Sequence, residues 1–372
     1  MSVRVSYKKQ FIFGIMILLI FLVVIEGLAR IWEFNPPKCV VVERDAGNDV
    51  DPSLAKQICL DTYSTEYYRE SIFLMKPNQH FQTLNINSHG FRGPETTIEK
   101  PENTFRIFIT GGSTALSTLS TSDETSISGV MQKLYDEKEL GIKVEVINGA
   151  TGGYTSLEEN WLVKNKMLAF EPDLIIFYDG GNDVRNRNLN TVEKIIAIYD
   201  ESEQKKPFKF KTYSFYRTPF VIYKILLEPT RTWGVPNDPP INEHIIEQVP
   251  LNWKNNIAEI CEIGKKENFQ VLVALQPLIG AGNKTIIGDE DNDVPQNNPR
   301  MYKSLSLYPN MKNRLAELDS ICEKTADLTN IFDNVMEPLY YDELHVNDKG
   351  HEIVASKLFE LTVPMVTEKI GK

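Results

Sequence analysis

Three residues of this sequence have the types and spacing of a nucleophile and its activating base. Ser113 follows an apolar run, residues 106–110, and two glycines, and a polar segment comes after it. In α/β folds a strand, a sharp glycine turn and a hydroxyl at a helix start present a nucleophile or cradle a phosphate. Asp342 precedes His345 by three residues, so its carboxylate can reach the imidazole across one tight turn. A base that takes the serine proton, and an acid that orients this base, would activate Ser113.

Two further positions can supply hydrogen-bond donors to an oxyanion. Gly153 follows a second apolar run, and Asn182 follows a third in the segment Gly180-Gly181-Asn182-Asp183. The backbone N–H groups of Ser113 and Gly153 and the side-chain amide of Asn182 are therefore the predicted donors. Gly152 precedes Gly153, so the register of the second donor stays open between these two glycines.

The competing interpretations of these residues are weaker. The Ser113 turn lacks the lysine of a phosphate-binding P-loop, and the sequence has no Gly-x-Gly-x-x-Gly, so a nucleophile is favoured over a phosphate site. His351 is an alternative base, but it falls inside a predicted helix and has no acid in a tight turn before it.

The elements that must position these residues alternate between strand and helix from residue 105 onward. This alternation predicts a parallel sheet covered by helices on both faces. The polar positions all follow strand ends, so we expect them at one edge of the sheet, where ligands bind in open α/β folds. The predicted strands are 105–110, 143–148, 173–178, 269–275 and 328–332, and the predicted helices are 122–139, 157–170, 241–266, 310–324 and 348–361.

Four sequence blocks, spread over residues 104–360, resemble those of the SGNH, or GDSL-type, hydrolase family. The blocks are Gly111-Gly112-Ser113, Asn148 with Gly152–Ser156, Gly180–Asp183, and Asp342–His345 with the following residues 346–355. One departure is that Gly112 stands where many members have Asp. The apolar N-terminal segment, residues 11–32, and the segment Gly90–Pro94 also resemble those of membrane-anchored bacterial members of this family. Some of these members are thought to act on surface polysaccharides.

The resemblance implies a three-layer α/β/α sandwich with a flavodoxin-like parallel sheet. It implies Ser113 as nucleophile, His345 as base oriented by Asp342, and Ser113, Gly153 and Asn182 as oxyanion donors. These groups all come from the chain, so we expect no metal and no organic cofactor. The expected partner is an acyl-ester substrate, and the expected reaction is ester hydrolysis by an esterase or deacylase on acylated cell-surface glycans or lipids.

Two alternatives to hydrolysis remain open. An O-acyltransferase acting on a surface polysaccharide would use the same three residues, because it differs only in whether water or an alcohol accepts the acyl group. A catalytically idle scaffold anchored in the membrane is the third hypothesis, and the intact Ser113, His345 and Asp342 argue against it.

The N-terminal segment, residues 1–34, carries a membrane signal. Residues 11–25 are apolar and uncharged, and Arg4, Lys8 and Lys9 precede them. Read as far as Trp32, the apolar span reaches the roughly 20 residues that cross a bilayer, which favours an uncleaved anchor. The positive charges before the span favour an extracytoplasmic body of the protein. Cleavage at a small-residue site, 27–29, would instead make the protein secreted.

The rest of the chain divides into an N-terminal extension, residues 35–100, and a hydrolase domain, residues 101–372. Residues 184–240 break the alternation of strand and helix, and we interpret them as a cap over the site or a surface excursion. The net charge of −11 argues against nucleic acid as a partner. Of the four cysteines, Cys39 and Cys59 are the pair expected first in an oxidising compartment, with buried free thiols as the alternative.

Overall fold

The structure, a computed structural model, describes residues 6–33, 50–185, 241–294, 297 and 299–371. The chain separates into two compact units, one formed by Met1–Cys39 with Ser214–Asn237 and the other by Val40–Tyr213 with Asp238–Lys372. The predicted cap falls almost entirely on residues 186–240, which lie outside the described residues.

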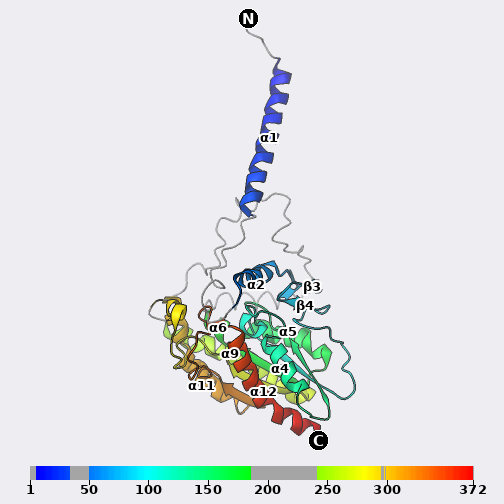
Figure 1. Ribbon diagram of the computed structural model, residues 1–372, viewed down its shortest axis with the longest axis vertical. Helices are drawn as coiled ribbons and strands as arrows, with labels where there is room; N and C mark the ends of the chain where they lie inside the picture. The colour runs from blue at the N-terminus through cyan, green and yellow to red at the C-terminus, as the bar shows by residue number, and fades with distance from the viewer. Residues whose placement is uncertain (1–5, 34–49, 186–240, 295–296, 298, 372) are drawn as a thin grey trace. The chain divides into compact units, whose positions relative to one another are not determined.

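The described part of the first unit is one helix, α1 (Tyr7–Glu33), drawn in blue in Figure 1. Its segment Tyr7–Leu28 has a mean hydropathy of 2.9 and buries none of its residues in the protein. The helix is therefore long and apolar enough to cross a membrane. A signal sequence has the same properties, so anchor and signal sequence both fit this helix.

The second unit is built on a parallel five-stranded sheet in the order β6-β5-β7-β8-β9. In chain order this is 2-1-3-4-5, the flavodoxin-like order, which reverses direction between β5 and β7. Side chains that follow these strands therefore meet at a topological switch point. The strands are β5 (Thr104–Thr110), β6 (Lys143–Asn148), β7 (Leu174–Asp179), β8 (Gln270–Leu275) and β9 (Lys324–Asp327).

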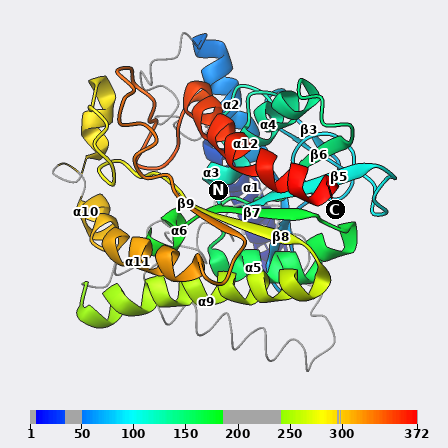
Figure 2. The same ribbon diagram turned by 90° about the horizontal axis from the view of Figure 1, so that it is seen from below.

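Helices cover both faces of this sheet (Figure 2). On one face lie α4 (Ile127–Asp136) and α12 (Asp348–Ile370), and on the other lie α5 (Ser156–Asn165), α9 (Glu243–Glu267) and α11 (Tyr308–Leu318). The three-layer α/β/α sandwich with a flavodoxin-like sheet is thus confirmed. The remaining short helices are α3 (Ser113–Leu116), η1 (Met167–Phe170), α6 (Gly181–Arg185), η2 (Gly288–Asp293) and α10 (Pro299–Leu305).

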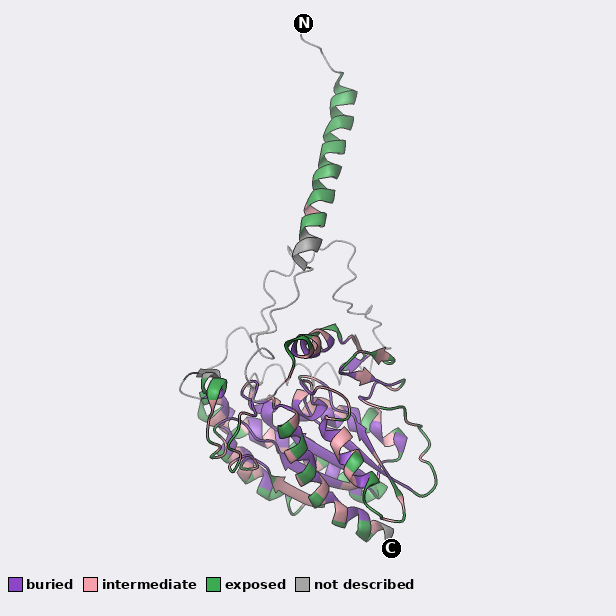
Figure 3. Ribbon diagram, viewed as in Figure 1, coloured by how far each residue is buried: buried purple, intermediate pink, exposed green. Residues whose placement is uncertain are grey.

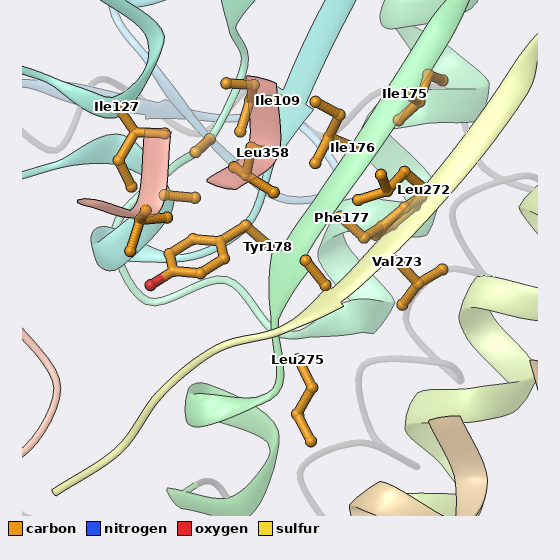
Figure 4. Packing of buried hydrophobic residues seen from close by; sticks show 14 of the residues in the cluster. Ile109, Ile127, Ile175, Ile176, Phe177, Tyr178, Leu272, Val273, Leu275 and Leu358 are labelled. Atoms are coloured by element: carbon orange, nitrogen blue, oxygen red, sulfur yellow. The ribbon is translucent and has the colours of Figure 1, made fainter. Parts of the chain in front are cut away.

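The core lies between the sheet and its helices. The strands β5 and β7 are mostly apolar and are buried along their whole length, as expected for strands covered on both faces. The charged residue inside β5 is Arg106, which pairs with Glu145 of β6. Figure 4 shows Ile127 of α4 and Leu358 of α12 packed against Ile109 of β5. Figure 3 shows the same pattern over the whole unit, with buried strands and helices whose outer faces are exposed.

The segment before β5 packs on the same core. Its elements are α2 (Pro52–Ser64) and the short strands β1 (Tyr67–Arg69), β2 (Phe73–Met75), β3 (Gln79–His80) and β4 (Asn85–Ile86). Ile58, Met75, Ile86 and Phe91 from this segment are at most 1% exposed. The domain boundaries predicted from the sequence remain a prediction, but residues 52–91 contribute to the folded body.

Four element predictions were wrong in their bounds. The helix expected over 310–324 ends at Leu318, and the helix expected over 348–361 continues to Ile370. The fifth strand is Lys324–Asp327, not 328–332, because an edge strand can be polar while the apolar Leu328 and Phe332 are buried from a turn instead. The helix expected from about residue 122 begins at Ile127, because Ser126 caps it by accepting from the Gly129 N–H.

Cys261 of α9 forms a disulfide with Cys322, which lies just before β9. The bond closes a separation of 61 residues and joins a covering helix to the edge of the sheet. Cys39 lies outside the described residues, so its expected pairing with Cys59 stays a prediction.

Candidate active site

The turn between β5 and α3 places Ser113 at the carboxyl edge of the sheet, as the first residue of α3. Gly111 allows this turn because the chain passes very close to its neighbours. A Cβ added to Gly111 would lie 2.3 Å from the carbonyl oxygen of Tyr178 and 2.5 Å from the Ala115 Cβ. A glycine at position 111 is therefore required by the close packing of β5, β7 and α3.

Ser113, His345 and Asp342 form a continuous hydrogen-bonded chain. The Ser113 Oγ lies 2.7 Å from Nε2 of His345, although 232 residues separate them in the sequence. The other ring nitrogen of His345, Nδ1, lies 2.8 Å from Oδ2 of Asp342. This is the geometry of a hydroxyl, a general base and an orienting carboxylate.

The loop that carries Asp342 and His345 is held rigidly. Oδ1 of Asp342 accepts from the backbone N–H groups of Leu344 and His345, at 2.8 Å each, and the Tyr341 N–H donates to the carbonyl of His345 at 2.9 Å. Burial would raise the pKa of Asp342, but the charge of His345 and the hydrogen bonds from His345 and Leu344 outweigh it and lower the pKa. Asp342 is therefore held as a carboxylate.

Asn182 lies in α6, which begins directly after the β7 strand end. Its Nδ2 donates to the Tyr154 carbonyl at 2.8 Å, which uses one of the two amide hydrogens. This bond leaves the second amide hydrogen of Asn182 unused. Tyr154 belongs to the loop that carries Gly153, so this bond also links the two predicted donor loops.

Gly153 is the more open of the two glycines in its loop. It has a φ of +84°, and a Cβ added there would meet nothing within 4 Å. A Cβ on Gly152 would instead lie 3.6 Å from the Tyr67 hydroxyl. The choice between Gly153 and Gly152 as the donor stays a prediction, and the Tyr67 hydroxyl lies beside this loop.

Several contacts at this edge of the sheet carry no recognisable sequence signal. Arg185, at the end of α6, pairs with Glu343 at 2.8 Å and so joins the helix of Asn182 to the loop of His345. Gln276, which follows β8 and is 2% exposed, accepts from the Thr114 hydroxyl at 3.0 Å. These residues were missed because no local pattern distinguishes them from ordinary polar residues.

The alternative base does not meet the serine. His351 is 2% exposed inside α12. The expectation that no acid precedes it was wrong, because Asp348, three residues earlier, lies 3.9 Å from its Nδ1. Among the described residues, no group of three or more His, Cys, Asp and Glu side chains has the geometry of a metal site.

No protein-family model and no curated protein matches this chain. Among solved structures, it is similar to the acetyl xylan esterase AlAXEase, with 14% identity over 70% of this chain and 100% of that one and a TM-score of 0.39. It is also similar to TesA, with 13% identity over 70% and 98% and a TM-score of 0.39. A third similar structure is the acetylxylan esterase Axe2 of Geobacillus stearothermophilus, with 12% identity over 69% of this chain and 93% of that one and a TM-score of 0.40. Likenesses this distant carry no functional argument.

Proposed function

We propose that this protein is a serine hydrolase that cleaves a carboxylic ester through an acyl-Ser113 intermediate. The observation that carries the proposal is the hydrogen-bonded chain from Asp342 through His345 to Ser113, with distances of 2.8 and 2.7 Å. A base within hydrogen-bond reach of a hydroxyl, and itself oriented by a carboxylate, is the arrangement that activates serine in acyl transfer.

In this mechanism the Ser113 Oγ attacks the ester carbonyl while His345 Nε2 takes its proton. Asp342 fixes the tautomer of His345 and stabilises the imidazolium that forms. The N–H groups of Ser113 and Gly153 and the Nδ2 of Asn182 stabilise the oxyanion, each worth roughly 10²–10³ in rate. His345 then returns the proton to the leaving alkoxide, and a water molecule, activated by the same imidazole, releases the acid from Ser113.

We further propose that the hydrolase body is extracytoplasmic, tethered by α1 or released after its cleavage. The disulfide between Cys261 and Cys322 supports an oxidising compartment. A location outside the cytoplasm fits the expected substrates, which are acylated glycans or lipids of the cell surface.

The test is labelling of the full-length protein, in detergent, with a fluorophosphonate probe, together with hydrolysis of a small aryl ester. We expect Ser113→Ala and His345→Ala to lose labelling and to lower turnover by roughly 10⁴-fold or more. Matched controls are Ser320→Ala and His244→Ala, which alter an exposed serine and an exposed histidine on other elements. Both controls should label like the wild type.

Labelling that survives Ser113→Ala, or that is insensitive to His345→Ala, would contradict the proposal. The same protein, given an acceptor alcohol such as a glycan oligomer, distinguishes the acyltransferase alternative. Hydrolysis releases the free acid, whereas acyl transfer forms a new ester on the acceptor, so product analysis by mass spectrometry separates the two reactions.

A further inference from the structure

Three carboxyl groups that the mechanism does not use are buried together near the segments that carry Gly153 and Asn182. Glu159 of α5, Asp179 at the end of β7 and Asp183 of α6 are 0%, 1% and 8% exposed. The charges that act on Glu159 and Asp183 are those of other carboxylates. Charged groups are rarely buried without an opposite charge, so this cluster requires an explanation.

Asp183 joins the two donor loops directly. It follows Asn182 in the sequence, and its carboxyl accepts from the Ser156 hydroxyl at 2.7 Å and from the Ser156 N–H at 3.1 Å. Ser156 begins α5, three residues after Gly153. The Ser156 hydroxyl in turn accepts from Nδ2 of Asn256 at 3.0 Å, so α9 supports the same junction.

The carboxyl groups of Glu159 and Asp179 have no hydrogen-bond partner at standard geometry within the described part of the chain. The Gly180 N–H and the Trp253 indole are the donors nearest to Asp179. Asp179 is also close enough to Glu159 and Asp183 for its negative charge to act on both of them, so a proton on Glu159 and on Asp183 would remove the repulsion. Burial, and then the negative charge of Asp179, raises the pKa of Glu159 and of Asp183 well above the ordinary carboxyl value.

We propose that Asp183 is a positioning residue that clamps the Gly153 loop to α6 as a neutral acid, sharing its proton with Asp179. Glu159 shares a second proton with Asp179, so that the cluster holds two protonated acids, Glu159 and Asp183, and one carboxylate, Asp179. The clamp keeps the N–H of Gly153 and the amide of Asn182 in register with each other. This inference rests on the proposed function, because it assigns a role to the donors of that site.

The experiment compares Asp183→Asn with Asp183→Ala in the full-length protein in detergent, measuring kcat and KM for the aryl ester. With its amide oxygen in the place of Oδ1, Asp183→Asn can still accept from the hydroxyl and the N–H of Ser156. Its nitrogen, in the place of Oδ2, can donate to Asp179 but no longer accepts from the Ser156 N–H, so we expect kcat closer to that of the wild type than to that of Asp183→Ala. Asp183→Ala leaves both loops untied and should lower kcat roughly 10²-fold, the cost of misplaced catalytic groups, with little change in KM.

Infrared spectroscopy tests the protonation state without reference to turnover. The wild type should show the carbonyl band of protonated carboxyl groups at neutral pH, and Asp183→Asn and Glu159→Gln should each reduce it. Asp61 is the matched control, because this buried carboxylate accepts from the N–H and hydroxyl of Thr83 and from Gln57. Asp61→Asn would turn an amide N–H toward these donors, so it should lower the thermal midpoint where Asp183→Asn does not.

Loss of kcat in Asp183→Asn equal to that in Asp183→Ala would overturn the neutral clamp, and full activity in Asp183→Ala would overturn the clamp altogether. A calcium-dependent rise in thermal midpoint that Asp183→Asn abolishes would show carboxylate ligands instead of shared protons. A wild-type protein without Ser113-dependent turnover would reject the proposed function but not the shared protons. Absence of the carbonyl band of protonated carboxyl groups from the infrared spectrum would reject the shared protons in either case.

Discussion

The side-chain amide of Asn182 lies directly against Gly112, the residue before the nucleophile. A Cβ added to Gly112 would lie 2.2 Å from Nδ2 of Asn182 and 3.3 Å from the Tyr154 carbonyl oxygen. Separations of 2.2 Å are far below van der Waals contact, so only glycine fits here while Asn182 keeps its position. The contact therefore requires a glycine at position 112 of this chain.

Gly112→Ala is therefore expected to act through Asn182. The new methyl group must displace the amide from its hydrogen bond with Tyr154, and loss of one oxyanion donor should lower kcat roughly 10²–10³-fold. Asn182→Ala should lower kcat by a similar amount. In the double variant the methyl group has nothing to displace, so Gly112→Ala should add little to Asn182→Ala. Fully additive losses in this cycle would show that the two residues act separately.

Asp342→Asn should leave the loop folded and nevertheless lower kcat by about 10⁴-fold. The amide oxygen can replace Oδ1 of Asp342, but the amide nitrogen faces Nδ1 of His345 and favours the wrong tautomer. Steady-state hydrolysis of the aryl ester measures the loss. Asp319→Asn, an exposed aspartate whose carboxylate accepts from Thr325, is the control, and a loss of less than about tenfold in Asp342→Asn would contradict the orienting role.

The disulfide should contribute strongly to stability. Closing a loop with a separation of 61 residues lowers the entropy of the unfolded chain, so the double variant Cys261→Ala/Cys322→Ala should lose about 4 kcal/mol of unfolding free energy. Urea denaturation measures this loss. A reducing agent should destabilise the wild type by at least as much, and any effect that remains in the double variant would report the predicted Cys39–Cys59 pair. An unchanged urea midpoint in the double variant would contradict the expectation.

Because Lys166 is partly buried, we expect the unfolding free energy to rise with pH. Its ammonium group lies 4.6 Å from the centre of the Phe91 ring, and burial lowers its pKa from 10.5 to about 8, against the opposing charge of Glu70. Between these two values the unfolded chain binds more protons than the folded one, so the unfolding free energy increases as the pH rises through this window.

Lys166→Met should remove this increase. Urea denaturation at a series of pH values from 7 to 10.5 measures it, and the difference between wild type and variant cancels the titration of tyrosines. The unfolding free energy of the wild type minus that of Lys166→Met should increase as the pH rises above about 8. A difference that is constant over the whole window would show that Lys166 titrates at its ordinary value.

Much of the fold could be predicted from the sequence because its signals are local. The central strands are rich in β-branched and aromatic residues, and the turns that follow them are rich in glycine, so β5, β6 and β7 were predicted within one residue of their observed ends. The rule that parallel strands end at one edge of the sheet then predicts that Ser113 and His345 lie close together. The polar edge strand β9 was missed because it lacks the apolar period on which such predictions depend.

The sequence by itself determined the α/β class, the long apolar N-terminal helix and the candidate residues for nucleophile, base and orienting acid. Only the tertiary structure decided which polar residues support them. Asp183 meets Ser156 across 27 residues, and Thr114 meets Gln276 across 162 residues. Such partners depend on strand order and helix packing, which are set by burial of the whole core and not by local pattern. The shared protons of Glu159, Asp179 and Asp183 likewise arise only when three separate elements bury their carboxyl groups in one place.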